Sequence, residues 1–211
     1  GAHVTINDGN GADSLKITGK VASADVSLSG NDNNAVTIDS AAVGIKANIS
    51  VAGGDDIIVS KADNATLGIN SAAGDDVITI SGNESSVSID AGDGDDVITV
   101  SGKESSVSIN AGAGDDVIDI TKADKSKITI ATGDGDNTVK ISAATVSGSV
   151  TGGAGKDDTL VIAGANADLT VSAVETVNLT GKNGKVSVTG GTVNSSAGGA
   201  TINAAIVNVS D

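Results

Sequence analysis

The chain contains no cysteine, proline, phenylalanine, tryptophan, tyrosine or methionine, and its single histidine is His3. The absence of cysteine excludes a disulfide framework and a thiolate zinc site. A thick globular core is difficult to fill without aromatic or methionine side chains. No run of 18 apolar residues occurs, so the sequence predicts no membrane insertion. Residues suited to acid–base or nucleophilic catalysis are also scarce, and we expect that the chain is not an enzyme.

The residues that are present are mostly small, aliphatic or acidic. Of the 211 residues, 38% are hydrophobic and 29 are glycine, and the formal net charge is −15. The aliphatic residues recur at regular intervals, which is not typical of a disordered chain. The negative charge disfavours nucleic acid and anionic membranes as partners, and it favours cations or basic surfaces.

An internal repeat of 20 to 21 residues runs through the middle of the chain. Its first aliphatic column consists of Ile58, Ile78, Ile98, Ile118, Val139 and Leu160. A second column, from the other half of each repeat, consists of Leu67, Val87, Val107, Ile128, Gly148 and Leu169. Two single-residue insertions, within 121–127 and 151–158, keep these columns in register over six repeats. Such a period is typical of a solenoid.

Within each repeat the aliphatic residues lie two positions apart, as in Ile98 and Val100 and again in Val107 and Ile109. Period two indicates β-strands with one face turned inward. Equivalent strands of successive repeats must then pair in parallel, and each coil rises by about 4.8 Å. The sequence therefore predicts an all-β fold, a parallel β-solenoid with coils of about 20 residues and two short strands per coil.

The repeat is strongest in the middle of the chain and changes near residue 163. Residues 1–162 are predicted to form coils with acidic turns. Residues 163–211 are predicted to continue as irregular coils without acidic turns, and the spacing of their aliphatic residues gives no register. No proline, linker or charge run separates the two parts, so we expect one continuous domain.

One turn of each repeat is rich in glycine and aspartate, as in AGDGDDVIT at 91–99, whereas the opposite turn, SGKESS at 101–106, is not. Asp96 has the strand parity of Ile98, so its side chain is expected to point into the turn. The candidate metal-binding residues of these turns are Asp13, Asn34, Asp55, Asp56, Asp75, Asp76, Gly92, Asp93, Gly94, Asp95, Asp96, Gly112, Gly114, Asp115, Asp116, Asp134, Asp136, Asp157 and Asp158.

Stacking these turns brings like charges together. Two carboxylates about 5 Å apart repel by about 3 kcal/mol at an effective dielectric constant near 20. Carboxylate and carbonyl oxygens suit Ca²⁺, which takes six to eight oxygen ligands, better than Mg²⁺, which requires near-ideal octahedral geometry. The alternative interpretation is that aspartate and glycine are simply favourable turn residues that face water.

The acidic turns resemble the calcium-binding nonapeptide of the RTX family of secreted bacterial proteins, G-G-x-G-x-D-x-U-x. The segments at 8–16, 91–99 and 152–157 carry the match. The resemblance implies that Ca²⁺ is held between successive turns by the sixth-place aspartate and by loop carbonyls. An RTX β-roll has 18-residue coils with calcium along both edges. Here only one turn carries the motif, which implies one row of ions.

A second resemblance concerns residues 152–181, GGAGKDDTLVIAGANADLTVSAVETVNLTG, which look like segments of RTX-type bacterial surface-layer proteins. This resemblance implies a structural segment of a secreted surface-layer or fibre protein, located at the bacterial cell surface after type I secretion. Its partners would be calcium ions, further copies of itself, or neighbouring segments of a larger surface protein.

Two other functions remain open at this point. A calcium-dependent adhesin module would bind a glycan or another cell-surface ligand. A non-catalytic RTX appendage would be attached to a secreted enzyme. Both use the same repeats, so the sequence alone does not separate them from a surface-layer role.

A short aliphatic ladder has outward parity at Ile57, Val77, Val97 and Val117. Such a ladder either makes lateral contacts between solenoids or reflects the preference of strands for β-branched residues.

Overall fold

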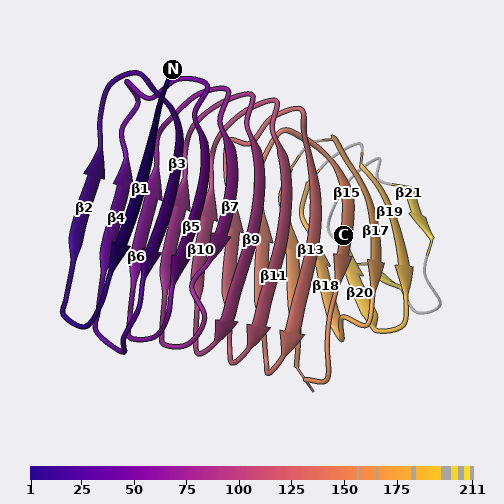
Figure 1. Ribbon diagram of the computed structural model, residues 1–211. Coiled ribbons are helices and arrows are strands. Elements are labelled where there is room, and N and C mark those ends of the chain that lie inside the picture. Colours follow the sequence, from indigo (N-terminus) through magenta and orange to yellow (C-terminus); the bar gives the residue numbers. More distant parts are fainter. Residues whose placement is uncertain (156, 165, 182–183, 196–200, 204–206, 210–211) are drawn as a thin grey trace.

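In the computed structural model the chain winds into a stack of coils that carry two parallel β-sheets (Figure 1). The structure describes residues 1–155, 157–164, 166–181, 184–195, 201–203 and 207–209. Over these residues each sheet has eleven strands. The odd-numbered strands form one sheet and the even-numbered strands form the other, hereafter the odd sheet and the even sheet. In both sheets every strand lies next to the equivalent strand of the following coil, which is the predicted parallel β-solenoid.

The strand bounds follow the repeat. The odd sheet contains β1 (Ala2–Asp8), β3 (Val21–Leu28), β5 (Lys46–Val51), β7 (Thr66–Asn70), β9 (Ser86–Asp93), β11 (Ser106–Ala113), β13 (Ser126–Asp134), β15 (Thr145–Thr151), β17 (Asn166–Ser172), β19 (Lys185–Thr189) and β21 (Thr201–Asn203). The even sheet contains β2 (Ser14–Ile17), β4 (Ala35–Ile38), β6 (Ile57–Ser60), β8 (Val77–Ile80), β10 (Val97–Val100), β12 (Val117–Ile120), β14 (Thr138–Ile141), β16 (Thr159–Ile162), β18 (Thr176–Leu179), β20 (Thr192–Ser195) and β22 (Val207–Val209).

The register of the sheets confirms the two aliphatic columns. Ile98 of β10 pairs with Ile78 of β8 on one side and with Ile118 of β12 on the other. In the odd sheet Val107 of β11 pairs with Val87 and Ile128 in the same way. A one-residue slip would turn every inward side chain to the solvent, so these columns fix the register.

The core is a thin layer of aliphatic side chains between the two sheets. Ile98 and Ile118 are fully buried, and Val107 and Ile109 are 2% exposed. Each buried Val or Ile side chain contributes roughly 1.5–3 kcal/mol relative to an exposed one. Because two short strands face each other across each coil, Val, Ile, Leu and Ala fill the space without aromatic residues.

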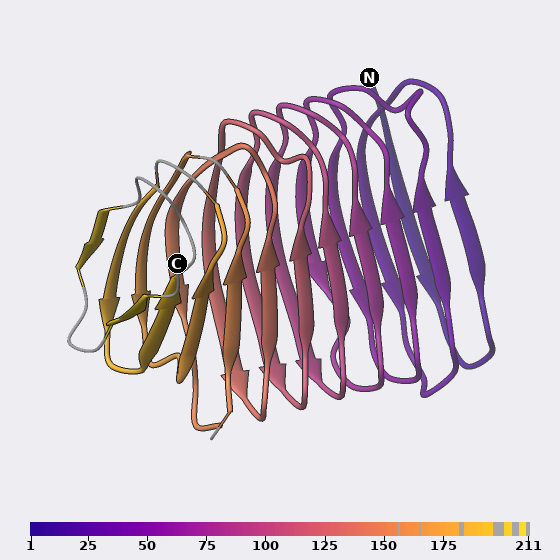
Figure 2. The same cartoon turned by 180° about the vertical axis from the view of Figure 1, so that it is seen from behind.

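The coils change in length at both ends of the stack. Near the N-terminus Ala24 pairs with Ala47, 23 residues later. Beyond residue 163 the pairing continues with shorter coils, because Leu160 pairs with Val177 and Val177 pairs with Val193, spacings of 17 and 16 residues. The solenoid therefore narrows toward its C-terminal end, as the orange and yellow coils show from behind (Figure 2).

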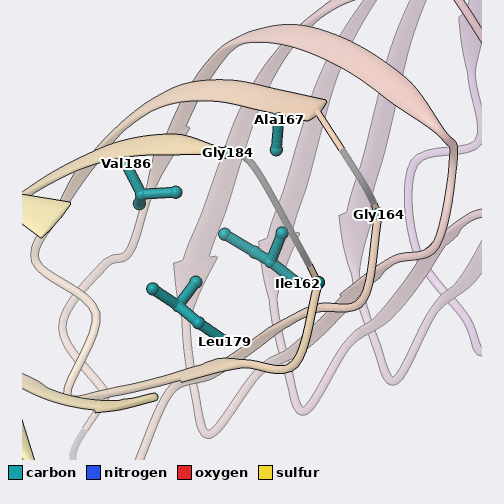
Figure 3. Close-up of a pocket in the computed structure, with 7 residues that line it drawn as sticks. Ile162, Gly164, Ala167, Leu179, Gly184 and Val186 are labelled. Atoms are coloured by element: carbon teal, nitrogen blue, oxygen red, sulfur yellow. The ribbon is translucent and has the colours of Figure 1, made fainter. Parts of the chain in front are cut away.

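A small apolar cavity of about 10 Å³ lies where the coils shorten (Figure 3). Ile162, Leu179 and Val186 point into it from three different strands, with Ala167 opposite. The cavity is about the size of one water molecule and offers no polar side chain to hold one. It marks a local mismatch in packing between coils of different length.

Candidate metal-binding edge

The turns that lead from each odd strand to the next even strand form one edge of the solenoid, which we call the acidic edge. The tight stacking of these turns requires glycine. Gly94 has φ +132°, and a Cβ there would collide with the carbonyl oxygen of Gly74 in the preceding coil. Gly92 and Gly112 have φ +111° and +117°, and a Cβ at either position would collide with a carbonyl oxygen of the coil before it, that of Ala72 and that of Gly92 respectively. Only glycine combines a positive φ with so close an approach.

One side chain from each of the first eight of these turns points into the solenoid, and together they form what we call the inner column. Its members, in chain order, are Asp13, Asn34, Asp56, Asp76, Asp96, Asp116, Asn137 and Asp158. Asp76 is fully buried, and Asp56, Asp96 and Asp116 are 1% exposed. Their inward direction is the one that strand parity predicts.

From Asn34 onward, the Oδ1 atom of each inner-column side chain accepts a backbone hydrogen bond from the coil before it. The Asp76 N–H donates to Asp96 Oδ1 at 2.8 Å, and the Asp96 N–H donates to Asp116 Oδ1 at 2.9 Å. The same bond recurs along the column from Asp13 to Asp158, at nitrogen–oxygen distances between 2.6 and 3.0 Å. These bonds tie neighbouring coils together at the turn.

The second carboxylate oxygen has no such bond. The Oδ2 atoms of Asp56, Asp76, Asp96 and Asp116 are buried and have no hydrogen-bond partner among the described residues, and neither does Asp13 Oδ2. A buried polar atom without a partner costs about 1–3 kcal/mol, and more if it is charged. Four consecutive coils therefore each carry a buried oxygen without a hydrogen-bond donor among the described residues.

The asparagines of the same column show what surrounds that oxygen. Asn137 Nδ2 donates to the carbonyl oxygens of Gly133 and Gly135, at 3.3 and 3.2 Å. Gly112 is the register partner of Gly133. By this equivalence we expect Asp116 Oδ2 to take the position of the Asn137 amide nitrogen, beside the carbonyls of Gly112 and Gly114. Such an arrangement would bring oxygen atoms together with no hydrogen-bond donor between them.

Burial and mutual repulsion shift the pKa values of the inner carboxyls upward. Burial, followed by the charges of Asp116 and Asp76, raises the pKa of Asp96 from 3.8 to about 7. The pKa values of Asp76 and Asp116 rise to about 6, again mainly through burial, and that of Asp56 is also raised. Asp76, Asp96 and Asp116 therefore bind protons near neutral pH unless a cation takes the place of the proton.

The remaining aspartates of the motif lie outside this column. They form an exposed row that we call the outer column, which consists of Asp55, Asp75, Asp95, Asp115, Asp136 and Asp157. From Asp55 to Asp136 each Oδ1 accepts a backbone N–H of the following coil, as when the Asp95 N–H donates to Asp75 Oδ1 at 2.9 Å. Asp93 and Asp134 are exposed at the ends of β9 and β13. The structure thus separates the predicted ligands into a buried and an exposed row.

The opposite edge has an uncharged equivalent of the inner column. The Ser85 N–H donates to Ser105 Oγ at 3.1 Å, and the Ser105 N–H donates to Ser126 Oγ at 3.0 Å. The hydroxyl of Ser105 in turn donates to the Lys103 carbonyl at 3.1 Å. Serine thus supplies the inter-coil bond and leaves no oxygen unsatisfied, so the backbone does not require aspartate in this role.

Comparisons with protein-family models, with curated proteins and with solved structures find no match to this chain. The described part of the chain contains no helix long and apolar enough to cross a membrane.

The arrangement of the acidic edge fits a hard cation bound partly by the backbone. In the described residues no three His, Cys, Asp or Glu side chains come together as a metal cluster. A cation at the inner column would instead be held by the Oδ2 atoms of Asp56, Asp76, Asp96 and Asp116 together with turn carbonyls. An all-oxygen ligand set of this kind suits Ca²⁺.

The sequence analysis missed two sets of side chains that accept hydrogen bonds from the backbone of a neighbouring coil. The Asp158 N–H donates to Glu175 Oε2 at 3.0 Å, so a glutamate continues the inner column into a coil that has no Gly–Asp turn. The sequence spacing could have predicted this role. Glu175 precedes Val177 by two residues, as Asp158 precedes Leu160, and Leu160 and Val177 are register partners. The second set is Ser85, Ser105 and Ser126 at the opposite edge. Their spacing of 20 and 21 residues matches the repeat and could have predicted that they stack.

Proposed function

We propose that this chain is a structural segment of a secreted bacterial surface-layer or fibre protein, and that Ca²⁺ bound along its acidic edge orders it. The observation that carries the calcium proposal is the buried Oδ2 of four successive inner-column aspartates, which has no hydrogen-bond donor among the described residues. The contacts of Asn137 Nδ2 with the carbonyls of Gly133 and Gly135 indicate which carbonyl oxygens would join these Oδ2 atoms around a cation. The surface role is supported by the elongated, repetitive fold and by the sequence resemblance.

Electrostatics explains why the proposal needs a cation. The inner-column carboxylates are stacked at the coil spacing of about 4.8 Å, and at that distance they repel by about 3 kcal/mol per pair at an effective dielectric constant near 20. A divalent cation replaces this repulsion with attraction and gives each Oδ2 a ligand bond. Asp76, Asp96 and Asp116 would each contribute a carboxylate oxygen, and Gly92, Gly94 and their equivalents would contribute carbonyls.

Calcium binding would couple folding of the solenoid to export. Because each coil contacts mainly its neighbours, stability is approximately a sum of coil and interface terms. At the low calcium concentration of the cytosol the inner column would repel and weaken every interface along it. Extracellular calcium would bind only the stacked coils, so its binding free energy would become folding free energy. The folded rod would then associate with further copies or with neighbouring segments of a larger surface protein.

The test is a thermal melt followed by circular dichroism in EDTA and in millimolar CaCl₂. We expect β-structure in calcium and a melting temperature that falls by more than 10 °C, or loss of the β-spectrum, after chelation. MgCl₂ at the same concentration is the control and should restore much less stability, because Mg²⁺ requires octahedral geometry. Identical melting in EDTA and calcium would contradict the proposed coupling.

A further inference from the structure

The inner column changes from carboxylate to amide at both ends of its run of four aspartates. Asn34 precedes Asp56, and Asn137 follows Asp116. Both asparagines are buried, at 5% and 1% exposure, and both accept the inter-coil bond with Oδ1 as the aspartates do. The two residue types therefore occupy the same position and differ in what the second side-chain atom presents.

In the asparagine coils that second atom is a donor. Asn137 Nδ2 donates to the carbonyls of Gly133 and Gly135, and Asn34 Nδ2 donates to the carbonyl of Asp32 at 2.8 Å. The amide NH₂ thus supplies positive hydrogens to the carbonyls that an Asp coil would offer to a cation. It does so without a net charge and without an ion.

Beyond Asn137 the column also finds a donor within the protein. Asp158 Oδ2 accepts the Gly153 N–H at 3.4 Å, so this carboxylate is not left unpartnered as the four central ones are. The coils with a fully buried aspartate and an unpartnered Oδ2 are therefore those of Asp56, Asp76, Asp96 and Asp116. Asp13 Oδ2 also has no partner among the described residues, but Asp13 is only half-buried and lies in the first turn of the stack.

We infer that Asn34 and Asn137 act as built-in substitutes for the cation, and that they confine ion binding to the four coils between them. This inference rests on the proposed binding of a cation at the acidic edge. It assigns Asn137 as a residue that determines how many ions the solenoid holds, and it implies that one side chain converts an ion-free coil into an ion-binding one.

The experiment is a calcium titration of Asn137→Asp by isothermal calorimetry, compared with the wild-type chain. We expect the calcium stoichiometry to rise, by up to one ion per chain. In EDTA the melting temperature of the variant should lie below that of the wild type, and saturating calcium should close the gap. Ser106→Asp is the matched control, because it adds the same charge on an exposed strand position beside Lys127. Its stoichiometry should equal that of the wild type.

The reciprocal variant, Asp116→Asn, keeps the test decisive even if Asn137→Asp does not fold. Its new amide should donate to the carbonyls of Gly112 and Gly114, lower the calcium stoichiometry and raise the melting temperature in EDTA. An unchanged stoichiometry in Asp116→Asn, or in a folded Asn137→Asp, would overturn the inference while leaving calcium binding by the wild type in place. A wild-type chain that binds no calcium would overturn the proposed function itself.

Discussion

Asp96 and Ser105, at opposite edges of the solenoid, accept the same kind of inter-coil hydrogen bond. The backbone N–H of the preceding coil donates to each at 2.8 and 3.1 Å. The Ser105 hydroxyl both accepts this bond and donates to the Lys103 carbonyl, whereas Asp96 keeps a buried Oδ2 without a partner among the described residues. A buried charge of this kind destabilises the fold unless it is neutralised. The chemical difference between the two edges therefore lies in one oxygen per coil.

The raised pKa values predict how the cation-free protein responds to pH. The pKa of Asp96 is 3.8 when unperturbed and about 7 in the fold, so the folded state binds protons more tightly than the unfolded state. The stability gained from this proton is fully present below about pH 4 and is lost as pH rises through about 7. In EDTA we therefore expect the melting temperature to fall between pH 4 and pH 8.

The control for this pH dependence is Asp96→Asn, whose side chain cannot titrate, so its melting profile in EDTA should be flatter than that of the wild type. Saturating calcium should flatten the wild-type profile as well, because the ion displaces the proton. A wild-type melting temperature that rises steadily from pH 4 to pH 8 in EDTA would contradict the assignment.

The strands and turns depend on side-chain size in opposite ways. The even strands need β-branched residues such as Ile98 and Ile118 to fill a thin core, and the turns need glycine so that successive backbones can touch. The aliphatic strand positions could be predicted from period two alone. The turn glycines at 92 and 94 could be predicted as loop residues, but their contact with the preceding carbonyls follows only from the three-dimensional stacking.

A pair of glycine substitutions on the same edge tests this stacking. Gly94→Ala should destabilise the protein by roughly 1–3 kcal/mol through backbone strain alone, with a further loss from the collision of Cβ with Gly74 O. Gly9→Ala meets no atom within 4 Å and is expected to stabilise by roughly 0.4–1 kcal/mol. The measurement is urea denaturation in calcium, and equal stability of the two variants would show that the turns are not tightly stacked.

At the scale of the whole molecule, the middle of the solenoid was predictable and its ends were not. The columns through Ile98 and Val107 predicted fold class and register, because a repeat of 20 to 21 residues with only two single-residue insertions allows one alignment. Beyond residue 163 the coils shorten to 17 and 16 residues, so no period could be read there. At the acidic edge, parity placed Asp96 inside. The donor role of the Asn137 amide depends on atomic contacts that a residue pattern does not contain.

The outward aliphatic ladder is the feature most relevant to association between solenoids. Ile57, Val77 and Val97 lie side by side on the even sheet and are 50%, 39% and 40% exposed. The double variant Val77→Lys with Val97→Lys should change the free energy of unfolding by less than about 1 kcal/mol, because these side chains are outside the core. Sedimentation in calcium should show weaker self-association. Unchanged association would mean that the ladder reflects strand preference only.

The most direct measurement of calcium-dependent neutralisation is a crystal structure grown in calcium, with anomalous diffraction collected to locate the ions. We expect anomalous peaks within 2.3–2.6 Å of the Oδ2 atoms of Asp76, Asp96 and Asp116, and none beside the Asn137 amide. Electron density that leaves those buried oxygens without a cation in saturating calcium would contradict the proposal that calcium orders this solenoid.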